Sequence, residues 1–183
     1  PESTPTVERR LAALAGAEST REQLLEALAA RDANALAEAI TDAVELTPSQ
    51  RGAYRAVQHV LAGEPGQVPL TEAQALSTLL DELLAEQRFA AFETVLRAWD
   101  AVALDTGERD EILARIYLGR GFVDSAAELW SRAWEDRQDS RAVVGFARIH
   151  ARQGDAEAAR ELAGEALELD PTLLEAQELL ASL

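Results

Sequence analysis

A segment of the sequence recurs thirty-three residues further along the chain. Residues 113–133 and 146–166 carry related residues at five common offsets, which are Ala114, Tyr117, Gly121, Ala126 and Ala133 in the first copy and Ala147, His150, Gly154, Ala159 and Ala166 in the second. A fixed interval of this length is typical of helical hairpins that stack and bury their apolar faces against one another. The sequence therefore predicts an all-α chain, an α-solenoid of antiparallel helical hairpins with about ten or eleven helices.

Turn residues and helix caps divide the chain into elements. We expect helices at 6–15, from Ser19 or Thr20 to the turn at 31–34, from there to about Glu45, at 49–62, from Thr71, around 89–99, in the hairpins 107–139 and 140–171, and at 174–183. Glu22 lies where it completes a capping box with Ser19, and Thr71 is expected to cap the helix that it opens. The segment 63–69, with two Gly and two Pro, is the clearest loop.

Residues 140–171 carry a recognisable combination of small residues and breakers, namely Ala147, Gly154, Asp155, Ala159, Ala166 and Pro171. This combination resembles the tetratricopeptide repeat, a helical hairpin of thirty-four residues with small residues where its helices cross. Residues 107–139 carry the same pattern with Gln138 in place of the proline, and residues 72–106 have no glycine in their turn at 86–88. The resemblance implies three to four repeats in a right-handed superhelix, clearest at 107–183.

The repeats imply a division of the chain and a core. We expect a linker remnant at 1–5, an irregular helical repeat region at 6–70, and regular repeats at 71–183 with a capping helix at 174–183, all in a single continuous solenoid domain. The crossing column contains Ala43, Ala98, Ala133 and Ala166, and a larger apolar column one residue on contains Val44, Trp99, Trp134 and Leu167. Leu76, Leu79, Leu80, Leu83 and Leu84 follow helical spacing and are expected inside.

Composition excludes several functional classes. The net charge of −16 disfavours nucleic-acid binding and attraction to anionic membranes, and no run of about 18 apolar residues exists to span a bilayer. The absence of cysteine removes disulfides and thiolate chemistry. All seventeen basic residues are arginine, which is typical of a GC-rich bacterial genome. We expect a cytoplasmic protein, while a start at Pro1 leaves a periplasmic or exported location open.

Catalytic motifs are missing from the sequence. No Gly-x-Ser-x-Gly turn and no glycine-rich phosphate loop is present, so we expect no enzyme activity and no cofactor. His59 has no Glu or His four residues away, which argues against a metal site, and His150 occupies a packed position of the repeat. The three tryptophans are compatible with a ligand cage, but their positions favour the core. They are Trp99, Trp130 and Trp134.

Charge is distributed unevenly along the chain. Residues 1–108 hold 8 Arg and 18 acidic residues (net −10), residues 109–152 hold 8 and 7 (net +1), and residues 153–183 hold 1 and 8 (net −7). In the family that the chain resembles, the first helix of each repeat lines a concave groove. Here that lining would contain Glu111, Arg115, Leu118, Arg141, Val144, Arg148 and Arg152.

Three of these arginines are spaced to form one patch. Arg148 and Arg152 are four residues apart on one helix face, and Arg115 lies one repeat before Arg148. Such a patch can bind carboxylates in a bidentate manner. The alternative is that each arginine pairs with a local acidic residue at the surface, a contact that contributes little.

These features predict a non-catalytic protein–protein interaction scaffold that binds a peptide or partner domain, acidic in character, in the groove. Two alternatives remain open. The chain can be an accessory domain of a larger bacterial enzyme such as a transferase, or a self-assembling structural repeat protein that forms a homo-oligomer. Nucleic acid and membrane insertion are not expected.

Overall fold

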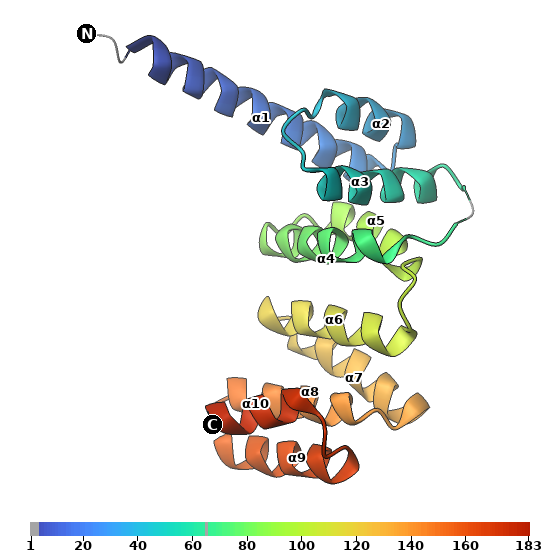
Figure 1. Ribbon diagram of the computed structural model, residues 1–183, viewed down its shortest axis with the longest axis vertical. Helices are drawn as coiled ribbons and strands as arrows, with labels where there is room; N and C mark the ends of the chain where they lie inside the picture. Colours follow the sequence, from blue (N-terminus) through green and yellow to red (C-terminus); the bar gives the residue numbers. More distant parts are fainter. Residues whose placement is uncertain (1–3, 65) are drawn as a thin grey trace. The chain divides into compact units, whose positions relative to one another are not determined.

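The computed structural model describes residues 4–64 and 66–183, and these form ten α-helices (Figure 1). Among them the β structure amounts to one isolated bridge, so the predicted all-α class is confirmed for the described chain. The helices form two compact units, of which the first ends at Ala103 and the second begins at Leu104. Residue 71, where the sequence predicts the regular repeats to begin, lies inside the first unit.

The first unit contains five helices, which are α1 (Thr4–Ala30), α2 (Ala33–Asp42), α3 (Pro48–Leu61), α4 (Leu70–Ala85) and α5 (Phe89–Asp100). Helix α1 packs against α2 and α5, and α3 packs against α2, α4 and α5. The second half of α1 carries the buried side chains Leu24, Leu25 and Leu28, which contribute to the core of this unit. The five leucines predicted for α4 are all buried, as expected from their spacing.

Helix α1 runs without a break through the position where a helix start was predicted. Ser19 and Thr20 lie in its interior, and the Thr20 hydroxyl donates a hydrogen bond to the carbonyl oxygen of Gly16 at 3.0 Å. The predicted capping box with Glu22 is therefore wrong. The surrounding Ala, Leu, Arg and Glu residues have high helix propensity, and together they outweigh the lower propensities of Gly16, Ser19 and Thr20. Of the predicted linker 1–5, residues 1–3 lie outside the described part and Thr4 begins the helix.

The loop before α4 differs from its prediction at the helix start. Helix α4 begins at Leu70 directly after Pro69, so Thr71 lies in the first turn and does not cap it. Val68, which is buried, anchors the loop to the end of α5. Its backbone N–H donates to the carbonyl of Ala101 at 2.8 Å, and its carbonyl accepts from the N–H of Ala103 at 2.9 Å.

A single turn geometry recurs in both units. It places one residue in the left-handed conformation with φ between 56° and 87°, at Arg31, Gln87, Gly121 and Gly154. The backbone N–H of the next residue donates in each case to the carbonyl five positions earlier, at 2.9 to 3.1 Å. These bonds satisfy carbonyls left open at a helix C-terminus. The turn at 86–88 therefore forms the same geometry although it contains no glycine.

The second unit contains α6 (Thr106–Gly119), α7 (Val123–Arg137), α8 (Ser140–Arg152), α9 (Ala156–Leu169) and α10 (Leu174–Ser182). Helices α6 and α7, and likewise α8 and α9, form antiparallel hairpins, and α7 packs on α8 (Figure 1). Helix α10 covers α8 and α9, as predicted for the last helix. It closes a core cluster of Val143, Val144, Ala166, Leu173 and Ala176.

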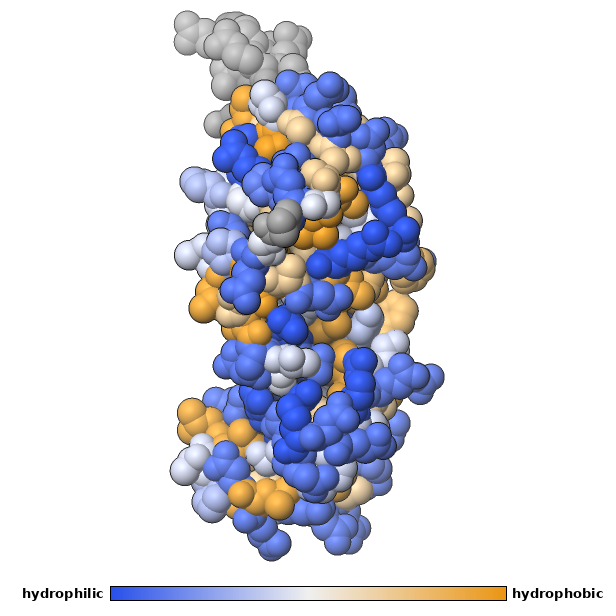
Figure 2. Space-filling model, turned by 90° about the vertical axis from the view of Figure 1, so that its right-hand side faces the viewer, coloured by the Kyte–Doolittle hydropathy of each residue, from blue (hydrophilic) through white to orange (hydrophobic). Residues whose placement is uncertain are grey.

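The predicted columns are buried or half-buried except at one position. All four alanines of the crossing column are buried, and Trp99 is too. Trp134 and Leu167 are half-buried. Val44 is 86% exposed, so its assignment to the core is wrong, because α2 ends at Asp42 and the chain leaves the helical path before Val44. The face shown in Figure 2 is mainly hydrophilic, with hydrophobic residues in separate areas.

Candidate functional site

The predicted site residues lie on α6 and α8 of the second unit, and acidic caps fix where both helices begin. The carboxylate of Asp105 accepts from the backbone N–H of Glu108 at 3.0 Å, and that of Asp139 accepts from the N–H of Arg141 at 3.0 Å. Each cap satisfies a donor that has no partner within its own helix. Because the starts are fixed, Glu111 and Arg115 on α6 and Arg148 and Arg152 on α8 each form a pair with a spacing of four residues on one helix face.

Trp130 of α7 lies between the two helices. A Cβ atom placed on Gly145 would lie 2.1 Å from the Trp130 ring, so the indole lies directly on the backbone of α8. Its Nε1–H donates to Glu111 Oε2 at 2.6 Å, which ties α7 to α6. Trp130 is 1% exposed, in agreement with its predicted place in the core. The need for a glycine at 145 was not predicted.

Glu111 is the buried centre of this arrangement. Its Oε1 accepts a hydrogen bond from Arg148 Nη1 at 2.8 Å, while its Oε2 accepts the hydrogen bond from Trp130. Burial raises the pKa of Glu111 above its ordinary value, and the contacts with Trp130 and Arg148 oppose that rise. The pair joins two helices that are one repeat apart, so Glu111 and Arg148 stabilise the unit from inside.

Arg141 is bound to the cap of its own helix. Its Nε donates to Asp139 Oδ1 at 3.0 Å and its Nη2 donates to Asp139 Oδ2 at 2.8 Å. Burial of Asp139 acts to raise its pKa, but the hydrogen bonds from Arg141 outweigh it, and the pKa lies below its ordinary value. The guanidinium also lies against Gly107 of α6, where an added Cβ would be 2.8 Å from Nη2. Two of the three guanidinium nitrogens of Arg141 are thus already engaged with Asp139.

The two apolar members of the predicted lining are buried inside the unit. Leu118 and Val144 belong to the core, and Val144 is part of the cluster that α10 closes. Their side chains pack against other helices of the unit and offer no surface to a partner. The family resemblance placed them in the lining of a groove, but each helix here is covered from more than one side.

Arg115 and Arg152 are the exposed members of the set. Neither side chain forms a hydrogen bond or an ion pair with any residue that the structure describes. Arg115 lies close enough to Glu111 to lower its pKa by charge attraction. The side chain of Arg148 remains 19% exposed beside its bond to Glu111. Arg115 and Arg148 thus both act on the buried charge of Glu111, and Arg152 follows one helical turn after Arg148.

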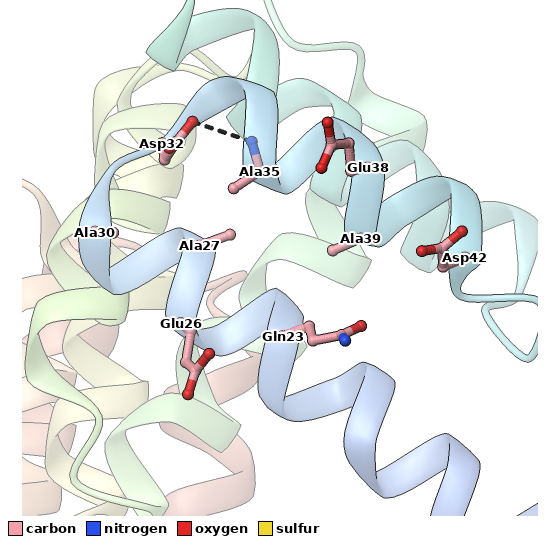
Figure 3. A pocket seen from close by; sticks show the side chains of 9 residues that line it. All are labelled: Gln23, Glu26, Ala27, Ala30, Asp32, Ala35, Glu38, Ala39 and Asp42. Carbon is pink, nitrogen blue, oxygen red and sulfur yellow. Dashed lines mark hydrogen bonds between the residues drawn. The ribbon is translucent and has the colours of Figure 1, made fainter.

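Two cavities lie in the first unit, and the sequence predicted neither. The larger, of about 360 Å³, lies between α1 and α2, where Ala27 and Ala39 point toward one another (Figure 3). Four carboxylates line it, those of Glu26, Asp32, Glu38 and Asp42. Asp32 serves as the N-cap of α2, accepting from the backbone N–H of Ala35 at 3.0 Å. Within the described residues, no three His, Asp or Glu side chains are placed to hold a metal ion.

The second cavity, of about 270 Å³, lies between α3 and α4. It is lined by Thr47, Ser49, Gln50, Ala53, Tyr54, Gln74, Ala75, Thr78, Leu79 and Glu82. Hydroxyl and amide groups thus surround a small apolar floor. No charged residue of α3 lines it, and Glu82 of α4 is its one carboxylate among the described residues.

The two histidines lie near single carboxylates. His59 Nδ1 is 3.8 Å from Glu64 and is exposed, and His150 Nδ1 is 3.5 Å from Asp155 with a half-buried ring, as predicted for its position in the repeat.

None of the helices described combines the length and apolar character needed to cross a bilayer. Comparison with protein-family models, with curated proteins and with solved structures gives no match.

Proposed function

We propose that the chain is a non-catalytic protein-interaction module with a tetratricopeptide-like solenoid architecture. Its binding surface is formed by Arg115, Arg148 and Arg152, and its partner is a protein segment that carries carboxylates. The observation that carries this proposal is the exposure of Arg115 and Arg152, whose side chains form no hydrogen bond or ion pair with a described residue. Residues 104–183 contain 9 Arg and 17 acidic residues (net −8), so internal carboxylates are abundant and these two arginines are still left unpaired.

The repeat geometry supports the architectural half of the proposal. The left-handed turn residue precedes the buried crossing alanine by eleven or twelve positions in each hairpin, from Arg31 to Ala43 in the first and from Gly154 to Ala166 in the last. Such regular placement is what stacked hairpins require, since each one buries its faces only against its neighbours.

The chemistry of arginine supports the choice of partner. A guanidinium presents a planar fork of N–H donors that matches a carboxylate, and exposed charges speed the encounter with a partner of opposite sign. The position of Arg148 adds to this, since only its Nη1 is bonded to Glu111 and the rest of its fork is open toward the surface. A partner with two acidic side chains can therefore contact more than one of the three arginines.

The test compares proteins captured from a lysate of the source organism by three versions of the full chain. They are the natural sequence, the double variant Arg115→Gln with Arg152→Gln, and the control Arg132→Gln, which removes an exposed arginine from α7 of the same unit. We expect a partner that the natural sequence and the control retain and the double variant loses. Arg148 is kept because its removal would leave Glu111 buried without its cation.

Capture of the same set of proteins by all three versions would show that the arginine surface is not the binding site. Ionic strength gives a second reading. Because exposed charges are screened within about 10 Å at 0.1 M salt, capture that depends on these arginines is expected to weaken as salt is raised.

Self-association is a second candidate function, favoured by two exposed leucines near the end of the second unit. Leu169 at the end of α9 and Leu174 at the start of α10 are 51% and 65% exposed. Light scattering over a concentration series tests it. A molar mass that rises with concentration, and falls back in Leu174→Gln, is the expected result, whereas a constant monomer mass would exclude it.

A further inference from the structure

The cavity between α3 and α4 has the size and lining of a binding site for a small group. Its volume of about 270 Å³ is below the roughly 300–1,000 Å³ of typical sites for small molecules, so it suits one side chain or a short-chain ligand. Its apolar part is provided by Ala53 of α3 and by Ala75 and Leu79 of α4. The remaining lining residues are polar, and one of them is charged.

Tyr54 provides a hydroxyl group in this lining that has no hydrogen-bond partner among the described residues. The residue as a whole is only 7% exposed, but its oxygen is not among the buried atoms that have no partner, so it remains accessible from the cavity. A tyrosine hydroxyl in this position can bind water or a polar group of a ligand. Burial raises the pKa of Tyr54 to about 12, so the hydroxyl is neutral at physiological pH and offers an oxygen lone pair.

Glu82 provides an unneutralised charge in the same lining. Its carboxylate is exposed and forms no ion pair with a described residue. Arg21 of α1 donates to Glu86 at 2.6 Å, and its positive charge also acts on Tyr54 and Glu82. Arg21, Glu82 and Glu86 together carry a charge of −1, so a cation is the complementary ligand.

The other polar groups of the lining are mostly engaged. Thr47 and Gln50 bond to each other in the capping box of α3, through the Thr47 N–H at 3.0 Å and the Gln50 N–H at 3.3 Å. The Thr78 hydroxyl donates to the carbonyl of Gln74 at 2.9 Å and accepts from Gln74 Nε2 at 3.5 Å, which leaves one lone pair of its oxygen as an acceptor. The open groups therefore include three acceptors, on Tyr54, Thr78 and Glu82. An ammonium group has three donors and no acceptor.

We propose that this cavity binds a primary ammonium group on a short aliphatic stem. Glu82 and the Tyr54 hydroxyl bind the ammonium, and the stem lies over Ala53, Ala75 and Leu79. A lysine side chain of a partner protein and a free alkylamine share this chemistry. The site lies in the first unit and is independent of the arginine surface of the second.

The test follows backbone amide signals of the full chain by NMR while n-butylamine is added at pH 7. We expect saturable shifts at the amides of Ala53, Tyr54, Ala75 and Leu79, and none with n-butanol, which has the same stem without the charge. Glu82→Gln and Tyr54→Phe are each expected to weaken binding by about tenfold, since a hydrogen bond to a charged group is lost. Glu26→Gln, which removes a carboxylate from the other cavity, should bind as the natural sequence does.

A second titration identifies the source of the amine. A blocked peptide containing one lysine is compared with the same peptide acetylated at that lysine, which removes the charge. Tighter binding of the lysine peptide than of n-butylamine would assign the site to a partner protein, and equal binding would assign it to a free amine. The proposal is overturned if no amine gives saturable shifts, if n-butanol gives the same shifts, or if Glu82→Gln binds n-butylamine unchanged.

Discussion

Two tryptophans, one in each unit, are equally buried but differ in their hydrogen bonding. Trp99 in the first unit and Trp130 in the second are each 1% exposed. The indole N–H of Trp130 donates to Glu111, whereas that of Trp99 has no hydrogen-bond partner among the described residues. The same residue type therefore contributes only packing in one unit and packing plus a charged hydrogen bond in the other. Burial alone does not tell how much a side chain stabilises its surroundings.

The ion pairs of the two units differ in the same way. In the first unit, three exposed pairs join α1 and the turn after it to the turn at 86–88 and to α5, namely Arg21–Glu86, Arg88–Glu22 and Arg31–Glu93. In the second unit, the pair of Arg148 with Glu111 is largely shielded from water. Exposed pairs contribute little, while loss of one partner from a shielded pair leaves an unpaired buried charge. The second unit should therefore be the more sensitive to single polar substitutions.

The largest expected difference comes from replacing each tryptophan with phenylalanine. Trp130→Phe should lower the free energy of unfolding by about 3 kcal/mol, since it removes ring volume and a hydrogen bond to a charged group. Trp99→Phe should cost about 1 kcal/mol or less, because it also removes an unpaired buried donor. Urea denaturation measures both. Equal losses in the two variants would mean that the bond to Glu111 contributes nothing.

Gly145 tests the close packing of Trp130 against α8. Gly145→Ala should destabilise the protein by about 2 kcal/mol, because the new methyl group overlaps the indole ring. Gly164→Ala is the matched control in α9, where nothing lies within 4 Å of the added Cβ. There the substitution should stabilise by about 0.5–1 kcal/mol through helix propensity. Thermal or urea unfolding gives both signs, and a stabilising Gly145→Ala would contradict the packing that we describe.

The left-handed turns permit a comparison between the units with opposite substitutions. Gln87→Gly should stabilise the protein by about 0.5 kcal/mol. A side chain in the left-handed conformation costs about 1–2 kcal/mol, and glycine removes this cost. Part of the gain is lost because glycine also raises the conformational entropy of the unfolded chain. Gly121→Ala should destabilise by about 1 kcal/mol for the same reason. Denaturation midpoints measured at one temperature show both changes. Shifts of both midpoints in the same direction would contradict the preference of this turn position for glycine.

The exposed ion pairs should give the smallest effect. Glu22 accepts two hydrogen bonds from Arg88, at 3.0 and 2.9 Å, and both side chains are 44% exposed. Glu22→Gln should cost about 0.5 kcal/mol. The loss should vanish near 1 M salt, where screening acts within about 3 Å. A loss of several kcal/mol, or one unaffected by salt, would place this pair with the shielded pair of the second unit.

The comparison also shows which parts of the fold were predictable. The repeat interval and the column of small residues correctly located the hairpins and their buried alanines, since both depend on local spacing. The turn at 86–88 was predicted with its glycine missing, but Gln87 was not identified as its left-handed residue, although its hydrogen bond matches those at Gly121 and Gly154. Backbone hydrogen bonds determine such a turn, and glycine only makes it less costly.

The candidate site was predictable to a smaller extent. Helical spacing correctly placed Glu111 and Arg115 on one face of α6, and Arg148 and Arg152 on one face of α8. It did not show that Glu111 is buried and bound by both Trp130 and Arg148, because that contact joins residues nineteen and thirty-seven positions apart. The cavity beside Tyr54 has no sequence pattern of its own, because it results from how two helices approach each other.

The amino-acid sequence by itself determined the helices, the hairpin interval and the acidic charge, all of which follow from residue type and spacing along the chain. Only the tertiary structure decided which arginines are free. Arg141 and Arg148 are engaged by carboxylates, and Arg115 and Arg152 are not. The physical reason is that a charge is neutralised by whichever group lies within a few ångströms of it, and packing between helices decides which group that is.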